Sequence, residues 1–416
     1  METPPGTRPP SRTVSSTVAI LICTLVTVME GYSLIVFGSV IPLLLVDPSL
    51  HLDPGTAGLV GSVIYAGMLI GALVCGVVGD RIGRQPVLLV GIALFSLGFL
   101  VSGLADGPWL LGVARLLSGL GVGGAISTAL ALARSHAPEH RASLVVNITM
   151  AGIPLGGALT ALIGLVVMPQ LGWRPMFFIG AGLTVVIFLV VLSVRLETGR
   201  PEARTQPVSP LRQMFAGRGW VLALLIAAVA IPNMFTWFGL NVWLTAAMTT
   251  LKYPLTSALL FSFTLTAGAV VGSMVAAPLA DRFGTTRVAK VTGVLTVLGL
   301  VGIVSSPGSL PLSLVCVALM GAGGHTTENL LNTAASNLYP APIRGTVLGW
   351  TNGISYIGAI GPIFGGLVIG SHLGAYGVFV LFGCSAFLVL VALTAFGAVT
   401  RRHDQVLTPT AVLATP

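Results

Sequence analysis

Long apolar runs are the feature of this sequence that most restricts its fold. A transmembrane helix needs about 20 consecutive, mostly apolar residues, and twelve runs of the sequence reach this length. Hydrophobic residues make up 55% of the chain and charged residues only 8%, so one water-soluble core could not bury this much apolar surface. The sequence therefore predicts an all-α membrane protein with twelve transmembrane helices. They are expected at 17–45, 56–79, 86–105, 108–133, 142–167, 174–195, 219–249, 255–279, 286–305, 309–336, 343–371 and 374–399.

A short polar motif separates the second and third runs in each half of the chain. Gly76–Arg84 has the sequence GVVGDRIGR, and Ala277–Gly284 has the related sequence APLADRFG. Asp80 and Asp281 are thus separated by about half the chain. Because each copy follows the second apolar run of its half, the pattern indicates two pseudo-symmetric six-helix bundles. Carriers that work by alternating access commonly have such internal repeats around a central site.

Positive charges are concentrated in alternate loops between the predicted helices. When these loops are assigned to one side of the membrane, the loops of the other side contain only Arg174 and Lys252 as basic residues. Because cytoplasmic loops carry the excess of Lys and Arg, we expect a multi-pass protein of the cell (inner) membrane with both termini in the cytoplasm. The predicted domains are a cytoplasmic N-terminal tail (1–16), a six-helix bundle (17–195), a cytoplasmic linker (196–218), a second six-helix bundle (219–399) and a cytoplasmic tail (400–416).

Charge and cysteine content exclude several other classes of protein. In a soluble protein the net charge of +8 would suggest an acidic partner, but in a membrane protein cationic loops set the orientation, so no nucleic acid partner is expected. The cysteines all lie inside apolar runs without CxxC spacing, which predicts packing residues and neither a disulfide nor a metal site. The chain has no GxxxxGK[ST] motif, so ATP is not expected to drive it. We expect no cofactor and a monomer in the lipid bilayer.

The Gly76–Arg84 motif resembles the GxxxDRxGR signature that members of the major facilitator superfamily carry between helices 2 and 3. Further segments along the whole chain resemble the aromatic acid:proton symporter group of that superfamily. The resemblance implies the major facilitator fold, a proton-driven secondary carrier, and a role in proton coupling for the helix 4 arginine, Arg115. The segments that carry it are Glu30–Pro42 (EGYSLIVFGSVIP), Arg115–Gly124 (RLLSGLGVGG), Phe238–Leu244 (FGLNVWL), Leu338–Trp350 (LYPAPIRGTVLGW) and Gly358–Gly366 (GAIGPIFGG).

The chain departs from the pattern of this group at three positions. Ser33 lies where the group usually has its second acidic residue, and Tyr356 lies where an arginine would be expected. Gln85 replaces a second basic residue in the loop after helix 2. These differences concern the substrate more than the fold. The resemblance assigns Tyr32 and Tyr356 to the central cavity, so we expect both to contact the substrate.

Four ionisable side chains lie inside the predicted helices, where a charged group is costly and a functional role is the default expectation. Glu30 is near the middle of the first helix, where a carboxyl group can take up and release a proton; the alternative is a permanently protonated group that is hydrogen-bonded to a neighbouring helix. Arg115 lies toward the outer half of the fourth helix and keeps its proton. It needs Glu30 or a substrate carboxylate as acceptor, unless it only binds backbone carbonyls. The predicted proton-coupling residues are Glu30, Arg115, His325 and Glu328.

His325 and Glu328 lie three residues apart, and therefore on one face of the tenth predicted helix, where they can pair. Histidine titrates near physiological pH, so this face is expected to relay a proton or to bind substrate; a purely structural pair is the alternative.

A polar and aromatic stripe follows the seventh predicted helix. Asn233, Trp237 and Asn241 recur every four residues, and Phe238 lies beside them, so their side chains share one face. A ring flanked by amides suits a flat, partly polar ligand, whereas ordinary aromatic packing is the alternative for Phe238. The predicted substrate-binding residues are Tyr32, Asn233, Trp237, Phe238, Asn241, His325 and Tyr356.

The repeated loop motif is too far from the membrane midplane to touch a substrate. A carboxylate and its basic neighbours at a helix end can instead hold the two halves in one state, whereas a pure topology signal would explain the arginines but not the aspartate. The predicted conformational latch consists of Asp80, Arg81, Arg84, Asp281 and Arg282.

These observations predict a secondary active transporter that imports a small, aromatic organic acid by proton symport. The nearest alternative is a proton-coupled exporter of a drug or secondary metabolite, although Gly152-Ile153-Pro154 only approximates the Gly-Pro signature of helix 5 in such exporters. An enzyme is not expected, because His325 and Glu328 lack the HExxH spacing of a metal-dependent hydrolase. A sensor that does not transport is a further alternative, which an uptake assay separates.

Overall fold

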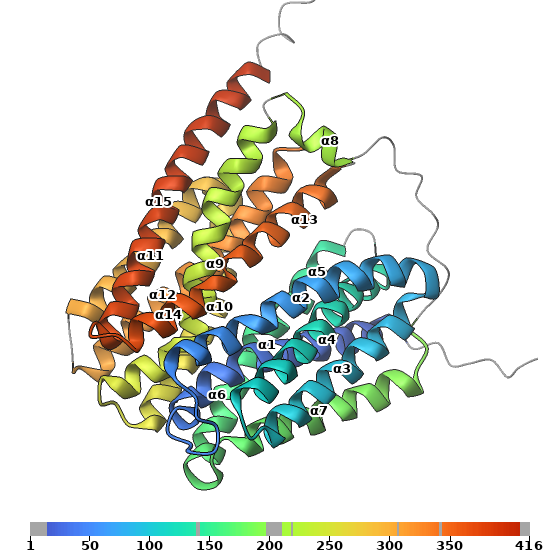
Figure 1. Cartoon of the computed structure of the whole chain (residues 1–416). Coiled ribbons are helices and arrows are strands. Elements are labelled where there is room, and N and C mark those ends of the chain that lie inside the picture. Colours follow the sequence, from blue (N-terminus) through green and yellow to red (C-terminus); the bar gives the residue numbers. More distant parts are fainter. Residues whose placement is uncertain are drawn as a thin grey trace, which may run out of the picture.

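The computed structural model describes residues 15–138, 142–196, 210–217, 219–305, 308–340 and 343–407. Within these residues the chain is helical, and twelve segments are long and apolar enough to span a membrane. The predicted all-α class and the predicted number of spans are therefore confirmed (Figure 1). Of the predicted tails and linker, residues 1–14, 197–209, 218 and 408–416 lie outside the described residues.

The first half of the chain forms six spans from seven helices. Ser15 caps the first helix through its side chain, and Asp53 accepts the backbone N–H of Thr56 over 3.0 Å at the start of the second, as N-cap residues do. The fifth span is divided at Ala151. The helices are α1 Ser16–Leu44, α2 Pro54–Ile82, α3 Arg84–Leu104, α4 Pro108–Ser135, α5 Ala142–Met150, α6 Gly152–Leu171 and α7 Arg174–Ser193.

The second half repeats this arrangement, with a short helix, α8 Pro210–Phe215, in the predicted linker. The eleventh span is interrupted by the 3-10 helix η3 Tyr356–Ile360, and the last helix continues beyond its expected end. The remaining helices are α9 Gly219–Thr250, α10 Leu255–Phe283, α11 Thr285–Ser305, α12 Leu310–Asn337, α13 Arg344–Ser355, α14 Gly361–Ile369 and α15 Gly374–Leu407.

The turns after α2 and α10 have the same backbone conformation. Gly83 and Gly284 end these helices with φ angles of 99° and 89°, a region that glycine adopts without the steric cost of a Cβ atom. Their N–H groups donate to the carbonyls of Gly79 and Ala280. The duplication seen in the loop sequences is thus also present in the backbone.

Helices pack closely within each half through small residues. A Cβ atom on Gly119 of α4 would collide with the carbonyl oxygen of Ile64 on α2. In the second half, a Cβ atom on Gly321 of α12 would collide in the same way with the carbonyl oxygen of Leu265 on α10. Equivalent helix pairs therefore cross backbone to backbone, as is typical of helices packed in membranes.

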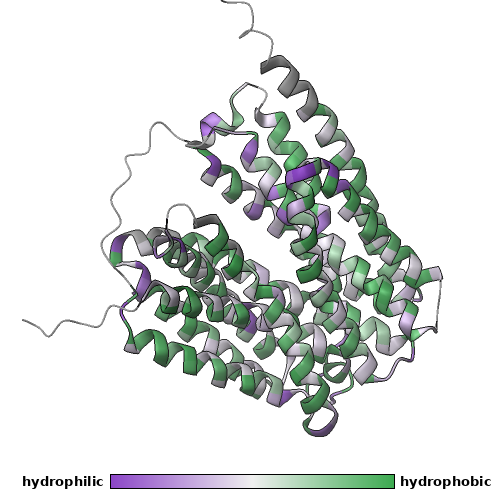
Figure 2. Cartoon of the chain, turned by 180° about the vertical axis from the view of Figure 1, so that it is seen from behind, coloured by the Kyte–Doolittle hydropathy of each residue, from purple (hydrophilic) through white to green (hydrophobic). Residues whose placement is uncertain are grey.

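The two halves contact each other mainly through the pairs α1–α9, α2–α14 and α6–α10. Gly58 near the start of α2 lies against the carbonyl of Pro362, and Gly366 of α14 lies against the carbonyl of Pro54. These contacts lie at the end of the molecule that carries the loop 45–53. Toward the opposite end, which carries α8, the helices of the two halves diverge (Figures 1 and 2).

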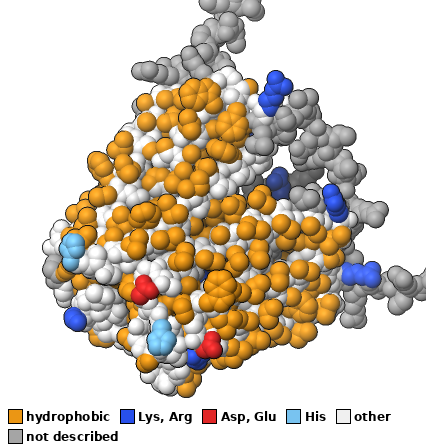
Figure 3. Space-filling model, in the orientation of Figure 1, with side chains coloured by type: hydrophobic (Ala, Val, Ile, Leu, Met, Phe, Trp, Pro, Cys, Tyr) orange, Lys and Arg blue, Asp and Glu red, His pale blue; other side chains and the backbone are white. Residues whose placement is uncertain are grey.

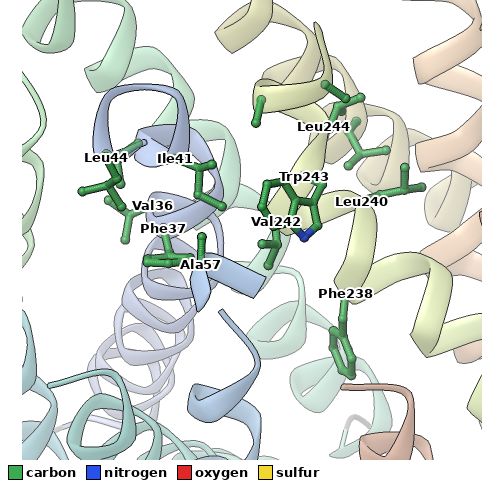
Figure 4. Packing of buried hydrophobic residues seen from close by; sticks show 14 of the residues in the cluster. Val36, Phe37, Ile41, Leu44, Ala57, Phe238, Leu240, Val242, Trp243 and Leu244 are labelled. Carbon is green, nitrogen blue, oxygen red and sulfur yellow. The ribbon is translucent and has the colours of Figure 1, made fainter. Parts of the chain in front are cut away.

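A continuous hydrophobic core crosses between the halves where they meet. Figure 4 shows Phe37 of α1 and Ala57 of α2 beside Val242 and Trp243 of α9, and all belong to one cluster of buried residues. The indole N–H of Trp243 donates to the carbonyl oxygen of Pro362 over 2.7 Å. This hydrogen bond fixes α14 to α9 within the second half, and the shared hydrophobic cluster joins the two halves.

The outer surface of the helices is apolar. Leu73 and Met274 expose 65% and 71% of their surface, and hydrophobic side chains cover much of the face shown in Figure 3, with charged side chains toward its margins. Such a broad exposed apolar surface is suited to lipid and not to water.

Candidate functional site

A small cavity lies between the two halves and is lined by residues of both. Helices α1, α2 and α6 of the first half and α9, α10 and α12 of the second line it. The lining residues are Gly31, Leu34, Ile35, Tyr65, Ile153, Pro154, Trp237, Phe238, Asn241, Thr266 and His325.

Aromatic rings from both halves form much of the wall. Tyr65 of α2 stacks on Phe238 of α9 with ring centroids 4.0 Å apart and planes inclined by 29°. Tyr356 of η3, a predicted substrate-binding residue, stacks on Phe238 at 6.3 Å and 16° but is not among the lining residues. Trp237 and His325 lie 5.3 Å apart, inclined by 35°. The wall of the cavity is thus rich in aromatic side chains that pack on one another.

Three of the predicted stripe residues on α9, Trp237, Phe238 and Asn241, line this cavity together with His325. Asn241 donates its side-chain N–H to the carbonyl oxygen of Trp237 over 2.7 Å. Its amide oxygen has no hydrogen-bond partner although the side chain is only 7% exposed. The cavity wall therefore carries an unpaired acceptor.

Glu30 lies on α1 next to Gly31, one of the lining residues. It is only 4% exposed, and its Oε2 atom has no hydrogen-bond partner. Tyr356 is within electrostatic range of this carboxyl group. A buried carboxyl without a compensating partner is strongly disfavoured as an anion, so proton exchange at Glu30 would change the energy of the site.

Arg115 on α4 is buried, with 1% exposed, and lies within electrostatic range of Tyr65. Its Nη1 atom donates to the carbonyl oxygen of Ser33 over 2.9 Å, and its guanidinium lies 4.8 Å from the centre of the Phe37 ring. Nε and Nη2 have no acceptor. In this structure Arg115 therefore does not pair with Glu30, and two of its donors are buried without an acceptor.

The predicted pair of His325 and Glu328 is not formed. Asn233 donates to Oε2 of Glu328 over 3.3 Å and to the carbonyl oxygen of Gly324 over 3.1 Å. The other carboxyl oxygen of Glu328 has no hydrogen-bond partner, while His325 faces Trp237 at the cavity. Asn233, and not His325, is the partner of Glu328, because α9 packs against α12.

Tyr32, predicted to bind substrate, does not line the cavity. Its hydroxyl group donates to the carbonyl oxygen of Met176 over 2.7 Å, and its ring packs edge-to-face on Phe99 at 5.7 Å. The side chain is fully buried among helices of the first half. Asn233 also lies behind the wall, bound to α12.

The predicted latch residues lie at the turns after α2 and α10, away from the cavity. Arg84 donates to the carbonyl oxygen of Ala131 on α4 over 3.2 Å, and Arg282 lies over the ring of its neighbour Phe283 at 5.2 Å. Arg81 and Asp281 are exposed. The side chain of Asp80 lies outside the described residues, and the latch stays a prediction.

Gln85, the departure from the loop pattern, binds the end of α7. Its side chain donates to the carbonyl oxygens of Val191 and Val194 over 2.9 and 2.6 Å and accepts the N–H of Leu196 over 3.0 Å.

At the other end of the linker, α8 packs on the second half. Met214 is buried, and the ring of Phe215 lies edge-on to Trp350 at 5.1 Å. Each end of the linker is thus fixed to its own half.

The sequence reasoning missed several wall residues, of which Tyr65 contributes most to the aromatic surface. Tyr65 and Thr266 both line the cavity, and they are separated by the same interval as Asp80 and Asp281. Adding the interval of the internal repeat to the position of Tyr65 would therefore have identified Thr266 as a wall residue.

Comparison of sequences assigns the chain to a family. The sequence profile of the Major Facilitator Superfamily matches residues 23–360 and 266–413. The chain is 32% identical over 389 residues to the gentisate transporter of Corynebacterium glutamicum, covering 90% of this chain and 86% of that protein. It is 28% identical over 413 residues to the benzoate transport protein of Acinetobacter baylyi, covering 89% and 87%.

Solved structures share the fold. A crystal structure of a D-xylose-proton symporter matches with a TM-score of 0.77 at 17% identity, covering 92% of this chain and 98% of that chain. A bacterial homolog of the human lysosomal transporter Spinster matches with a TM-score of 0.75 at 16% identity, covering 95% and 98%. At this identity the likeness concerns the fold alone.

The family accounts for the duplicated twelve-helix architecture, and the relatives in it are named as transporters, so the chain is a transporter and not an enzyme. The predicted resemblance, drawn from the loop after α2 and from segments along the chain, is confirmed. This chain belongs to the Major Facilitator Superfamily and is similar to those of its members that transport aromatic acids.

Proposed function

We propose that this protein imports a small aromatic acid together with protons by alternating access, across the cell (inner) membrane and with both termini in the cytoplasm. The observation that carries the proposal is the cavity between the halves, whose lining includes Tyr65, Trp237 and Phe238, with Tyr65 stacked on Phe238. Relatives named as transporters of gentisate, benzoate and 3-(3-hydroxy-phenyl)propionate support an aromatic acid as substrate.

The ring and the carboxylate of such a substrate need different partners. Aromatic faces in the wall suit the ring, and the free Nε and Nη2 donors of Arg115 suit the carboxylate. A guanidinium binds a carboxylate through two parallel hydrogen bonds. A buried Arg115 without an anion carries an uncompensated charge, which is costly, so substrate would bring the missing counter-charge.

Glu30 supplies the proposed proton site. With its proton bound, the carboxyl group is neutral and the halves can close around it at low cost; without the proton, a buried anion opposes closure. Coupling then follows, because the loaded carrier closes only when both substrate and proton are present. Glu328, buried at 6% exposure and bound by Asn233, is the second candidate for this role.

The contact between the halves supports a rocking cycle. Outward opening requires separation of α1 from α9 and of α2 from α14, while the ends that carry α8 come together. The loops at those diverging ends carry most of the basic residues, which favours a cytoplasmic location. The distribution of basic residues and the divergence of the halves at this end thus both support a state that is open to the cytoplasm.

Uptake into proteoliposomes tests this proposal. A panel of labelled aromatic and aliphatic acids is offered with an inward proton gradient, and again with the gradient collapsed by an ionophore. We expect accumulation of an aromatic acid only with the gradient. No accumulation of any acid, together with pH-driven movement of a cationic or neutral amphiphile, would overturn the proposal in favour of an exporter.

A further inference from the structure

One polar atom on the cavity wall is not used by the cycle described above. It is the amide oxygen of Asn241, which has no hydrogen-bond partner within the described residues. The side chain is 7% exposed, so bulk water does not satisfy this oxygen. An unpaired acceptor at such a position is unfavourable unless a donor arrives.

The orientation of the amide is fixed by its other end. The side-chain N–H of Asn241 donates to the carbonyl oxygen of Trp237 over 2.7 Å. If the amide were flipped, its oxygen would face that carbonyl oxygen, and two acceptors would repel each other. The end of the amide that remains unpaired is therefore an acceptor and not a donor.

The neighbours of Asn241 are suited to an aromatic ring. Trp237 and Phe238 precede it on α9, and Tyr65 stacks on Phe238 from the other half. All of these residues line the same cavity as Asn241. An aromatic ring bound in this cavity would therefore lie close to the amide of Asn241.

We propose that Asn241 selects aromatic acids that carry a hydroxyl group on the ring, because its unpaired amide oxygen accepts the hydroxyl hydrogen. This inference rests on the proposed function, since it concerns the same cavity. A site built to bind a hydroxyl group rejects the analogue without it, because the buried acceptor then stays unpaired. Unsubstituted benzoate would bind, but less tightly.

The test is a binding titration of the purified, full-length protein by calorimetry. The ligands are benzoate, its three monohydroxy isomers and the three fluorobenzoates, since fluorine is similar in size to a hydroxyl group but donates no hydrogen bond. For the best hydroxybenzoate we expect an affinity about tenfold higher than for the matching fluorobenzoate, the value of one well-made hydrogen bond.

The variant Asn241→Leu keeps the approximate size of the side chain and removes the acceptor. We expect the ratio of hydroxybenzoate to fluorobenzoate affinity to fall to about one, mainly through weaker binding of the hydroxybenzoate. Thr245→Val is the matched control. Thr245 lies one turn further along α9, is buried, and bonds Ser262 over 2.7 Å outside the cavity wall; its removal should keep the ratio of the wild type.

The outcomes separate this inference from the proposed function. If the wild type binds aromatic acids but does not distinguish hydroxyl from fluorine, the role of Asn241 is refuted and the proposed function stands. If Asn241→Leu keeps the wild-type ratio of hydroxybenzoate to fluorobenzoate affinity, the role of Asn241 is also refuted and the proposed function stands. The preference for the hydroxyl group would then belong to another wall residue such as His325. If no aromatic acid binds to the wild type, both are refuted. The comparison of ligands on the wild type stays decisive even if the variant does not fold.

Discussion

Trp173 donates its indole N–H to the carboxylate of Asp47 over 2.8 Å, and this bond ties the loop 45–53 to the start of α7. Asp47 also accepts the hydroxyl and the backbone N–H of Ser49 over 2.7 and 2.9 Å. Arg174 completes the cluster by donating to the carbonyl oxygens of Gly103 and Ala105. Three loops on one side of the first half are thus joined by hydrogen bonds.

The first prediction concerns the pH dependence of this cluster. The hydrogen bonds from the Ser49 hydroxyl and then from Trp173 hold the pKa of Asp47 below its ordinary value of 3.8. A carboxyl with a lowered pKa in the folded state stabilises that state fully above the unfolded pKa, and this contribution is lost as the pH falls through the folded pKa. Since Asp47 is only partly buried, the gain is about 1 kcal/mol or less.

Asp47→Asn should therefore lower the midpoint of thermal unfolding in detergent by about 1–2 °C at pH 7. The difference from the wild type should shrink as the pH is lowered below 4. The control is Asp106→Asn, at an exposed carboxylate on the loop between α3 and α4, which should not show this pH-dependent difference. A difference in unfolding midpoint between the wild type and Asp47→Asn that stays constant down to pH 3 would contradict the role of the ionised carboxylate.

The second prediction concerns Glu30. Glu30→Gln keeps the size of the side chain but cannot exchange a proton, so a proton gradient can no longer drive accumulation. In proteoliposomes the ratio of internal to external substrate should fall to about one, while exchange of internal for external substrate persists. Accumulation equal to the wild type would remove Glu30 from the coupling mechanism and leave Glu328 as the remaining buried carboxyl to test.

The third prediction concerns Arg115, whose Nε and Nη2 atoms lack acceptors. Lysine preserves the charge but cannot form two parallel bonds to a carboxylate. Arg115→Lys should raise the dissociation constant for an aromatic acid roughly tenfold, measured by calorimetry. The same variant should bind the uncharged amide of that acid as the wild type does; an equal loss for both ligands would indicate a structural role for the arginine.

The fourth prediction concerns the contact between α2 and α14. A side chain at Gly58 would meet the carbonyl of Pro362, so Gly58→Leu should hold the halves apart at this end. Transport should fall by about tenfold or more, because the closed state of this end becomes costly, whereas the purified variant should still bind substrate.

Gly182→Leu is the matched control for this change. Gly182 lies on α7, and a Cβ atom there would meet nothing within 4 Å, so its transport should equal that of the wild type. If Gly58→Leu loses substrate binding as well as transport, or if it aggregates in detergent, the variant is misfolded. Such a result would contradict a specific block of the contact between α2 and α14.

The spans and the duplication could be predicted because they depend on the length of apolar runs and on a repeated loop motif. The rotation of each helix about its axis was harder to predict. Tyr32 follows Gly31 directly, yet only Gly31 lines the cavity, since neighbouring residues on a helix point about 100° apart. A helix that is apolar toward both lipid and protein gives no periodic signal for its inner face.

The wall residues on α9 could be predicted because amides and an aromatic ring recur there at helical spacing. Tyr65 gave no such signal, since it is an isolated aromatic residue in an apolar run. The pairing of Glu328 with Asn233 also could not be read from the sequence. It depends on two helices crossing, and spacing along one helix indicates only which partners share its own face.

The attachment of the linker ends has a consequence for assembly. Gln85 holds the chain at Leu196 on the first half, and Phe215 holds α8 on the second. Fully extended, the chain from Leu196 to Pro210 reaches about 45–50 Å at roughly 3.3–3.6 Å per residue. The covalent connection therefore keeps the two anchored ends within this distance of each other while the bundles assemble. Two separately expressed bundles would keep both anchoring contacts and lose only this proximity.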